Sequence, residues 1–486
     1  MRALEAQYLL LPVAVPDNCC LDSRPPPWQT RSLNLCVNSH WPERKKTRLK
    51  SINLLLFLAL PAPLLAQYAG PAILSRGEAP AALAAPQIDF QPFVEVSAVY
   101  DTGLAGVALN EQGQLATSSS AGATLAWGIT GTHSWRHTKV GLAYHGALSF
   151  YAEQSRFSNL DQSLLFGVTH QITRHLMFSL NETAGLVTRN FGQLALQQTV
   201  PFDPSTAYVP VTDYFDNRTV YSTTQASLQI QKTARLSFAL GGSEFIVDRH
   251  SKALYGSRGT SATGDLQYRL SRMTTIGAQY EYLHFSYPGI IGSTDAHGAA
   301  ATYAVRLNRE WEFSGYGGFM RVESKFEQTV PIDPVIAALL GISGAEEITH
   351  QIAIVPNVAG RLSRTYRTGV AYLSAGHSVL PGNGLFLTST ATQVVLGYAY
   401  TGLRFWSFGA SGGYDRGTAV GTIAGDYADK NVSLLMSRVI ARHLNFVLSF
   451  SVRQYSSPTY VNYNRTIEEG SIGVGYSPGD IPLRVW

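Results

Sequence analysis

Apolar and polar residues alternate along most of this chain, in about 18 segments between residues 91 and 476 that each end in turn residues. Residues 174–182, 219–231 and 444–453 show the alternation most clearly. A period of two places successive side chains on opposite faces of a strand, so each segment has one apolar face and one polar or small face. The pattern predicts an all-β fold, a transmembrane antiparallel up-and-down β-barrel over residues 91–486.

Every second junction between these segments is short and carries Ser, Thr, Asn or Gly near an arginine. These junctions are Thr132–Arg136, Thr173–Arg174, Thr233–Arg235, Ser271–Arg272, Asn308–Arg309, Ser363–Arg364, Gly402–Arg404 and Ser437–Arg442. The junctions between them are longer, and the longest are residues 188–218 and 323–347. Short periplasmic turns and long extracellular loops are typical of outer-membrane barrels. With strands at 93–101 and 467–476 added, the count is about 18 strands (16–18), with both ends on the turn side.

Aromatic residues distinguish a barrel from a soluble sandwich, which could show the same alternation. Tyr280, Tyr282, Phe285 and Tyr287 gather toward one end of a segment. A second group gathers near turns, and its members are Trp311, Phe313, Tyr398, Tyr400, Phe405 and Trp406. Aromatic rings prefer the boundary between lipid and water, so these groups favour a membrane barrel.

Composition narrows the classes of function. Only 14% of the residues are charged, against about 25% in soluble domains. Residues 67–486 hold 29 basic and 29 acidic residues, so they lack the excess of positive charge that nucleic-acid-binding proteins carry. Cys19, Cys20 and Cys36 all precede this part, which excludes a thiolate metal site, a disulfide framework and a cysteine nucleophile from it.

The leading residues read as export signals. Residues 44–66 join a basic run to a short apolar core and a small residue, Ala66, which predicts a signal peptide cleaved there. Residues 1–43 resemble no part of such a peptide, and we expect a disordered leader or a mis-assigned start. Residues 67–90 are rich in Ala, Pro and Gly and predict a flexible periplasmic lead-in.

The exported, cysteine-free alternating body resembles the porin-like barrels of bacterial outer membranes. The terminal Trp486 resembles their assembly signal, although Pro478 and Pro482 suggest that the barrel closes near Tyr476. The phrases GPAILSRG at 70–77, VPIDPVIAALLG at 330–341 and HSVLPGNGLFLTS at 377–389 are similar to an uncharacterised acidobacterial group of barrels associated with exopolysaccharide or exosortase systems. This resemblance implies a Gram-negative outer-membrane setting and no known substrate.

Two sets of residues are candidates for function. The phase of the alternation predicts charged side chains that face the lumen at Lys139, His145, Asp265, Arg269, Glu281, Arg306 and Arg453. They either tune ion preference or simply solvate a polar wall, and because both signs occur we expect weak selectivity at most. The apolar stretch with Pro334, Ile336, Leu339, Leu340 and Gly341 either folds into the lumen as a constriction or packs among external loops.

We expect no enzyme, no cofactor and no metal site. His377 and Ser378 are adjacent in a strand, so their side chains point to opposite faces and do not form a catalytic pair. The leading hypothesis is a channel for passive or weakly selective passage of small solutes or saccharides. The alternative is a structural or export barrel of an exopolysaccharide system. The expected partners are outer-membrane lipid, the barrel-assembly machinery and small solutes or polysaccharide, and the sequence leaves the oligomeric state open.

Overall fold

The structure is a computed structural model. It describes residues 91–110, 115–188, 218–290, 292–330, 345–382, 384, 387–400, 402–420, 425–459 and 461–478. The predicted leader, signal peptide and lead-in, the stretch 334–341 and Trp486 all lie outside these residues.

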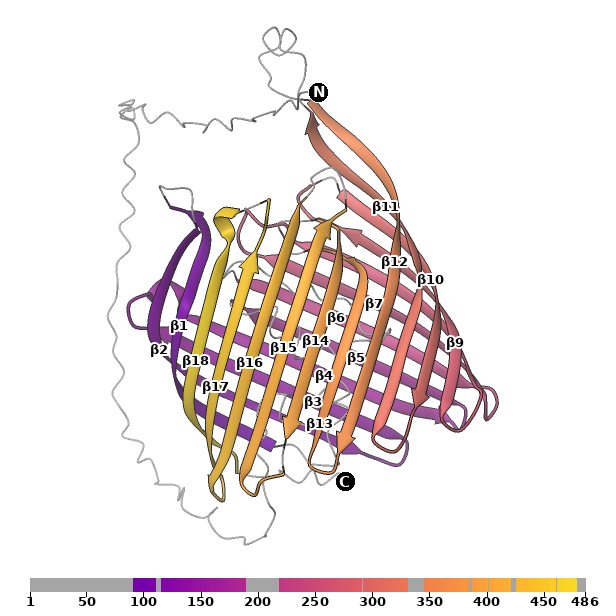
Figure 1. Ribbon diagram of the computed structural model, residues 1–486, viewed down its shortest axis with the longest axis horizontal. Coiled ribbons are helices and arrows are strands. Elements are labelled where there is room, and N and C mark those ends of the chain that lie inside the picture. Colours follow the sequence, from indigo (N-terminus) through magenta and orange to yellow (C-terminus); the bar gives the residue numbers. More distant parts are fainter. Residues whose placement is uncertain are drawn as a thin grey trace, which may run out of the picture. The chain divides into compact units, whose positions relative to one another are not determined.

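The described residues form 18 antiparallel strands in one closed sheet (Figure 1). Each strand pairs with the next along the chain, and β1 pairs with β18, so Val94 lies opposite Tyr476. Two short 3-10 turns, Ser155–Phe157 and Val461–Tyr463, accompany the strands. The strands are β1 Gln91–Leu109, β2 Leu115–Ser134, β3 Thr138–Tyr151, β4 Asn159–Thr173, β5 Leu176–Val187, β6 Thr219–Gln231, β7 Leu236–Arg249, β8 Ser257–Arg269, β9 Thr274–Ser286, β10 Gly292–Arg306, β11 Trp311–Val330, β12 Ala345–Tyr366, β13 Gly369–Leu380, β14 Ser389–Tyr400, β15 Trp406–Ala419, β16 Asp426–Ala441, β17 Leu444–Ser456 and β18 Arg465–Tyr476. The predicted fold class and strand count are confirmed.

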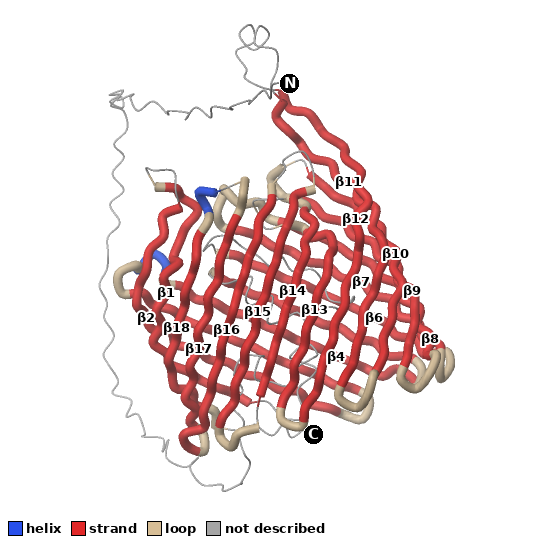
Figure 2. The backbone as a smooth tube through the Cα atoms, in the orientation of Figure 1, coloured by secondary structure: helices blue, strands red, loops and turns tan. Residues whose placement is uncertain are grey.

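The connections differ between the two rims, as predicted (Figure 2). Eight turns of two to five residues join β2–β3, β4–β5 and so on to β16–β17. The opposite rim carries nine connections of five to 31 residues. We call these rims the turn side and the loop side. β1 begins and β18 ends on the turn side, and the barrel closes at Tyr476 as expected.

Two predicted boundaries are wrong. Ser363–Arg364 is not a turn, because β12 continues to Tyr366 and turns at residues 367–368. The expected loop 323–347 is shorter, because β11 and β12 pair as far as Val330 and Ala345. Both strands run beyond their neighbours on the loop side (Figure 1).

Burial shows which face of each strand points outward. In β1, Val96 is 57% exposed and its partners in register, Leu125 and Val474, are exposed as well, whereas Val99 is 8% exposed. Tyr366, Tyr398 and Tyr476 lie on the outer face near the turn side, and Tyr100, Phe150 and Tyr280 lie on it farther toward the loop side. A closed sheet with an apolar outer band between two aromatic zones is the architecture of an outer-membrane β-barrel.

The alternation inverts toward the loop side. In β7 the outward residues change from Leu240 to Glu244, while the inward residues change from Ser237 to Phe245 and Val247. An outer face above the bilayer meets water, and an inner face there packs against loops, so the apolar side switches. Phe285 and Tyr287, which we expected in an aromatic girdle, are therefore buried inside the barrel. No helix in the described part of the chain is long and apolar enough to cross a membrane.

Candidate functional site: the barrel lumen

The strand register places all seven candidate lumen residues on the inner phase of their strands. Lys139 and His145 lie on the inner face of β3, where the imidazole of His145 is 5.9 Å from the ring of Phe93. Asp265 and Arg269 share the inner face of β8. Arg306 ends β10 at the turn side, 4.0 Å from the carboxylate of Glu312. These positions are spread over the barrel rather than gathered at one point.

Arg453 is not a free lumen charge. Its Nη2 donates a hydrogen bond of 2.7 Å to Oδ2 of Asp429 on β16, and its Nε lies 3.0 Å from both oxygens of that carboxylate. Both side chains are almost completely buried, and the guanidinium also lies over the Tyr455 ring at 4.6 Å. A bidentate pair of this kind holds neighbouring strands in register, since either charge left alone would be strongly destabilising.

Glu281 is also buried against the inner wall. Its carboxylate accepts a long 3.5 Å hydrogen bond from the side-chain amide of Asn357 on β12, three strands away. Gly298 and Gly318 lie on the inner face between them, and their lack of side chains leaves room for this contact across the wall. Of the seven candidates, Arg453 and Glu281 therefore support the wall, whereas Arg269 and Arg306 remain exposed.

Apolar side chains fill the loop-side end of the lumen. One inward-facing cluster comprises Val187, Tyr221, Phe245, Val247, Leu283, Phe285, Tyr287, Ala296, Met320, Val322, Phe326, Val355 and Val379. Leu387 and Val420, from the loop-side connections β13–β14 and β15–β16, pack against it. This half of the lumen is a packed core rather than a polar wall.

A bridging loop, residues 250–256 between β7 and β8, reaches the far wall. Its Leu254 belongs to a buried cluster with Tyr427, Tyr455 and Ile467 of β16, β17 and β18. In an 18-stranded closed sheet, β7 and β16 are diametrically opposed. The backbone N–H of Tyr255 donates to the carbonyl of Gly384 at 3.0 Å, which joins the bridging loop to the β13–β14 connection. The loop-side mouth is thus crossed by protein.

A chain of buried hydroxyls fastens the β13–β14 connection to the β9–β10 connection and to β10 and β11. Thr388 shares hydrogen bonds of 2.6 Å with both Tyr287 and Thr294, and Thr294 shares one of 3.2 Å with Ser324 on β11. Burial raises the pKa of the Tyr287 phenol above its usual range, so the hydroxyl stays protonated and able to donate. Gly384 has a φ of +91°, a conformation that favours glycine.

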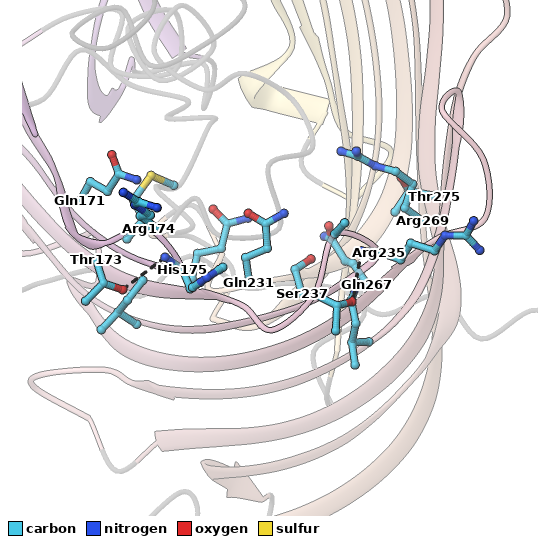
Figure 3. A pocket seen from close by; sticks show the side chains of 16 residues that line it. Gln171, Thr173, Arg174, His175, Gln231, Arg235, Ser237, Gln267, Arg269 and Thr275 are labelled. Carbon is cyan, nitrogen blue, oxygen red and sulfur yellow. Dashed lines mark hydrogen bonds between the residues drawn. The ribbon is translucent and has the colours of Figure 1, made fainter.

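The turn-side mouth contains an open cavity of about 440 Å³ (Figure 3). Its lining is rich in arginine and glutamine: Gln171, Arg174, Gln229, Gln231, Arg235, Gln267 and Arg269. Figure 3 shows Gln171, Arg174 and Gln231 extending from the wall into the barrel. Sequence reasoning found Arg269 and missed the others, although the glutamines that alternate through 219–231 were the available signal.

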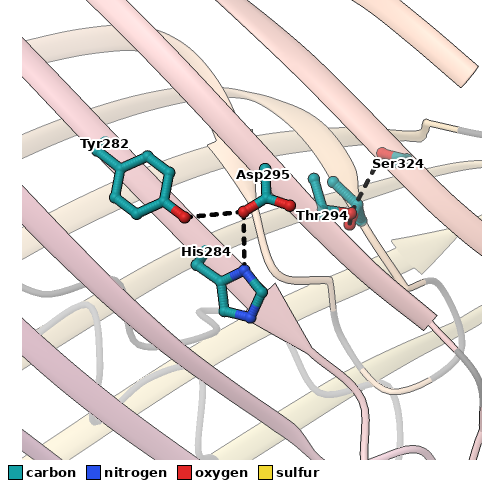
Figure 4. A network of polar contacts seen from close by, with 6 residues as sticks. Tyr282, His284, Thr294, Asp295 and Ser324 are labelled. Carbon is teal, nitrogen blue, oxygen red and sulfur yellow. Dashed lines mark hydrogen bonds and ion pairs between the residues drawn. The ribbon is translucent and has the colours of Figure 1, made fainter.

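The outer face carries polar groups as well. Asp295 accepts a 2.8 Å hydrogen bond from the Tyr282 hydroxyl and lies 2.9 Å from Nδ1 of His284, all on the outer side of β9 and β10 (Figure 4). His377 is also outward and lies 2.8 Å from the Thr392 hydroxyl, whereas Ser378 faces the opposite side. Among the described residues, no three His, Cys, Asp or Glu side chains could share a metal ion.

Comparison with known proteins adds distant structural likeness only. No family model and no curated protein matches the chain. OccK5 (OpdH) of Pseudomonas aeruginosa is 13% identical, with 81% of this chain and 99% of that chain covered and a TM-score of 0.36. OpdK of the same organism is also 13% identical, with coverage of 80% and 98% and a TM-score of 0.38. OccK2 (OpdF), solved in complex with glucuronate, is 11% identical, with coverage of 81% and 99% and a TM-score of 0.37.

Proposed function

We propose that this protein is an outer-membrane channel for small, water-soluble solutes, with passive or weakly selective passage. The observation that supports this most directly is the closed sheet of 18 strands, a size at which barrels enclose an aqueous lumen. The polar turn-side cavity supplies contacts for a solute, and the packed loop-side half narrows the route. We propose diffusion as the mechanism, with no cofactor and no chemical step.

Purified protein in planar bilayers tests the channel directly. We expect discrete conductance steps and a small reversal potential in a salt gradient, because charges of both signs lie on the inner phase: Lys139, Arg269 and Arg306 against Asp265 and Glu312. A steep reversal potential would contradict weak selectivity. Deleting residues 334–341 tests the constriction that the sequence suggested: unchanged conductance would leave the narrowing to the bridging loop and its contacts.

The alternative, an export or structural barrel of an exopolysaccharide system, has one observation in its favour. The contacts of Leu254 and Tyr255 cross the loop-side mouth, and a component that opens only with its partners would be closed alone. Silence of the wild type in bilayers, followed by conductance when residues 250–256 are replaced by a short glycine-serine turn, would favour this role.

A further inference from the structure

The hairpin of β11 and β12 extends past its neighbours on the loop side and leaves one strand edge unpaired (Figure 1). β12 pairs with β11 over its whole length, but its pairing with β13 stops at Val358, opposite His377. β13 continues beside β14 to Leu380. Among the residues that the structure describes, no strand therefore lies beside residues 347–357 on the β13 side of β12. At about 3.3 Å per residue, this open edge is roughly 35 Å long.

The backbone groups of β12 alternate in direction. The N–H of Thr365 donates to the carbonyl of Glu310, at 2.8 Å, so Thr365 faces the β11 side. The pairing with β11 keeps one register throughout, so every second residue counted from Thr365 also bonds to β11. The other set points its backbone groups to the open edge, and its members there are Ile348, His350, Ile352, Ile354 and Pro356. Proline fits within a sheet only where no partner needs its N–H, which agrees with the place of Pro356 and explains why β13 leaves β12 there.

The side chains along the open edge are apolar, whereas the outer face beside them is polar. The row in register with Ile352 contains Glu323 on β11 and Asp295 on β10. Figure 4 shows Asp295 with its hydrogen-bonding neighbours Tyr282 and His284. The outward isoleucines of β12 are 60%, 52% and 74% exposed, in the order Ile348, Ile352 and Ile354. Because their row is polar, these side chains lie above the bilayer, where an apolar stripe indicates an interaction site.

Sheet proteins normally protect an edge of this length. Charged side chains, short strands, bulges and covering loops are the common devices. No residue from Ile348 to Val358 is Asp, Glu, Lys or Arg, and the register between β11 and β12 contains no bulge. Pro356 blocks the base of the edge and leaves the rest open. On the inner side, Val355 is buried in the loop-side cluster, which holds the strand in place.

We infer that the open edge of β12 binds an extended segment of a partner polypeptide on the loop side of the membrane, which adds a strand to the barrel wall. A row of unpaired N–H and C=O groups matches the backbone of another strand, and alternate side chains of that strand pack on the isoleucines. The partner segment is therefore about ten residues long, with β-branched or aromatic residues at alternate positions. A second copy in the same membrane does not fit, because a two-fold axis along the membrane normal cannot bring two tilted β12 edges into one sheet. Docking at this edge does not depend on conduction.

The test uses two fluorescent peptides and two variants at one position. The first peptide has about ten residues of alternating valine and threonine, with a lysine at each end. The second has the same side chains, but methyl groups on two adjacent central backbone nitrogens block both of its edges. Ile352→Pro removes an N–H from the open edge and keeps the pairing with β11, whereas Ile352→Ala keeps that N–H and shortens the side chain.

Fluorescence anisotropy of the detergent-solubilised protein measures binding of each peptide. We expect the wild type to bind the first peptide and not the methylated one. Ile352→Pro should lose at least about tenfold in affinity, and Ile352→Ala should lose less than about threefold. Heat-modifiable gel mobility verifies that both variants are folded. Hydrogen exchange followed by mass spectrometry should show that the amides of Ile352 and Ile354 exchange rapidly alone and slowly with the first peptide.

Four results would overturn the inference. The wild type could fail to bind the first peptide. Equal binding of the two peptides, or equal losses in the two variants, would reduce the contact to apolar side chains. Slow exchange of the edge amides without peptide would mean that another segment of this chain already covers the edge. A particle mass that is larger in the wild type than in Ile352→Pro, by light scattering, would assign the edge to contacts between copies.

Discussion

Thr388→Val should open the loop-side mouth. Valine keeps the shape of threonine but removes the hydroxyl that shares 2.6 Å hydrogen bonds with Tyr287 and Thr294. Each bond contributes about 1 kcal/mol net, so the inward position of the β13–β14 connection should lose about 2 kcal/mol. That change is roughly a 30-fold increase in the ratio of released to docked states. The buried Tyr287 hydroxyl loses its partner, which adds to the loss.

Single-channel recording at fixed voltage measures this ratio as open probability. If the released state occupies about 1% of the wild type, the variant should be open for roughly a quarter of the time. Thr392→Val is the control, because it removes a hydroxyl from the outer face of β14, where Thr392 meets His377. An open probability that is the same in wild type and in Thr388→Val would refute the view that this contact limits passage. An equal rise in Thr392→Val would assign the effect to β14 in general.

Three further predictions concern the wall. Asp429→Ala leaves the Arg453 charge buried without its partner, so the free energy of unfolding in lipid vesicles should fall by about 3–5 kcal/mol. An undiminished free energy of unfolding would contradict this. The double variant Asp429→Leu with Arg453→Met removes both charges and should recover most of the loss. Glu182 faces outward on the same row as Thr224 and Glu244, and its carboxylate accepts hydrogen bonds from the hydroxyls of Ser222 and Thr224, so Glu182→Leu should lower the same free energy by about 1–2 kcal/mol, and an increase would show that this row lies in lipid. A Cβ at Gly318 would lie 2.0 Å from the backbone oxygen of Ala299, so Gly318→Val should reduce the yield of heat-resistant folded barrel several-fold, which gel mobility would show.

The sequence by itself determined the barrel, its strand count and its orientation. Period-two alternation indicates which side chains share a face of a strand, because the direction of successive side chains depends on backbone geometry alone. Short arginine-bearing turns report where neighbouring strands reverse, so the eight hairpins and the closure at Tyr476 could be read from local residues. The prediction failed for the turn at Ser363–Arg364, because the alternation there continues past the serine and arginine into Tyr366.

Only the tertiary structure decided what fills the lumen. The sequence predicts Phe285 in an aromatic girdle, yet it lies inside the barrel with Leu283, because the apolar phase inverts where the strands leave the bilayer. Arg453 looked like a free lumen charge, and a partner 24 residues away on β16 buries it. The contact of Leu254 with the opposite wall joins segments about 170 to 210 residues apart, and no local pattern encodes such a meeting. Contacts across the barrel depend on closure of the sheet, which brings together strands that are remote in the chain.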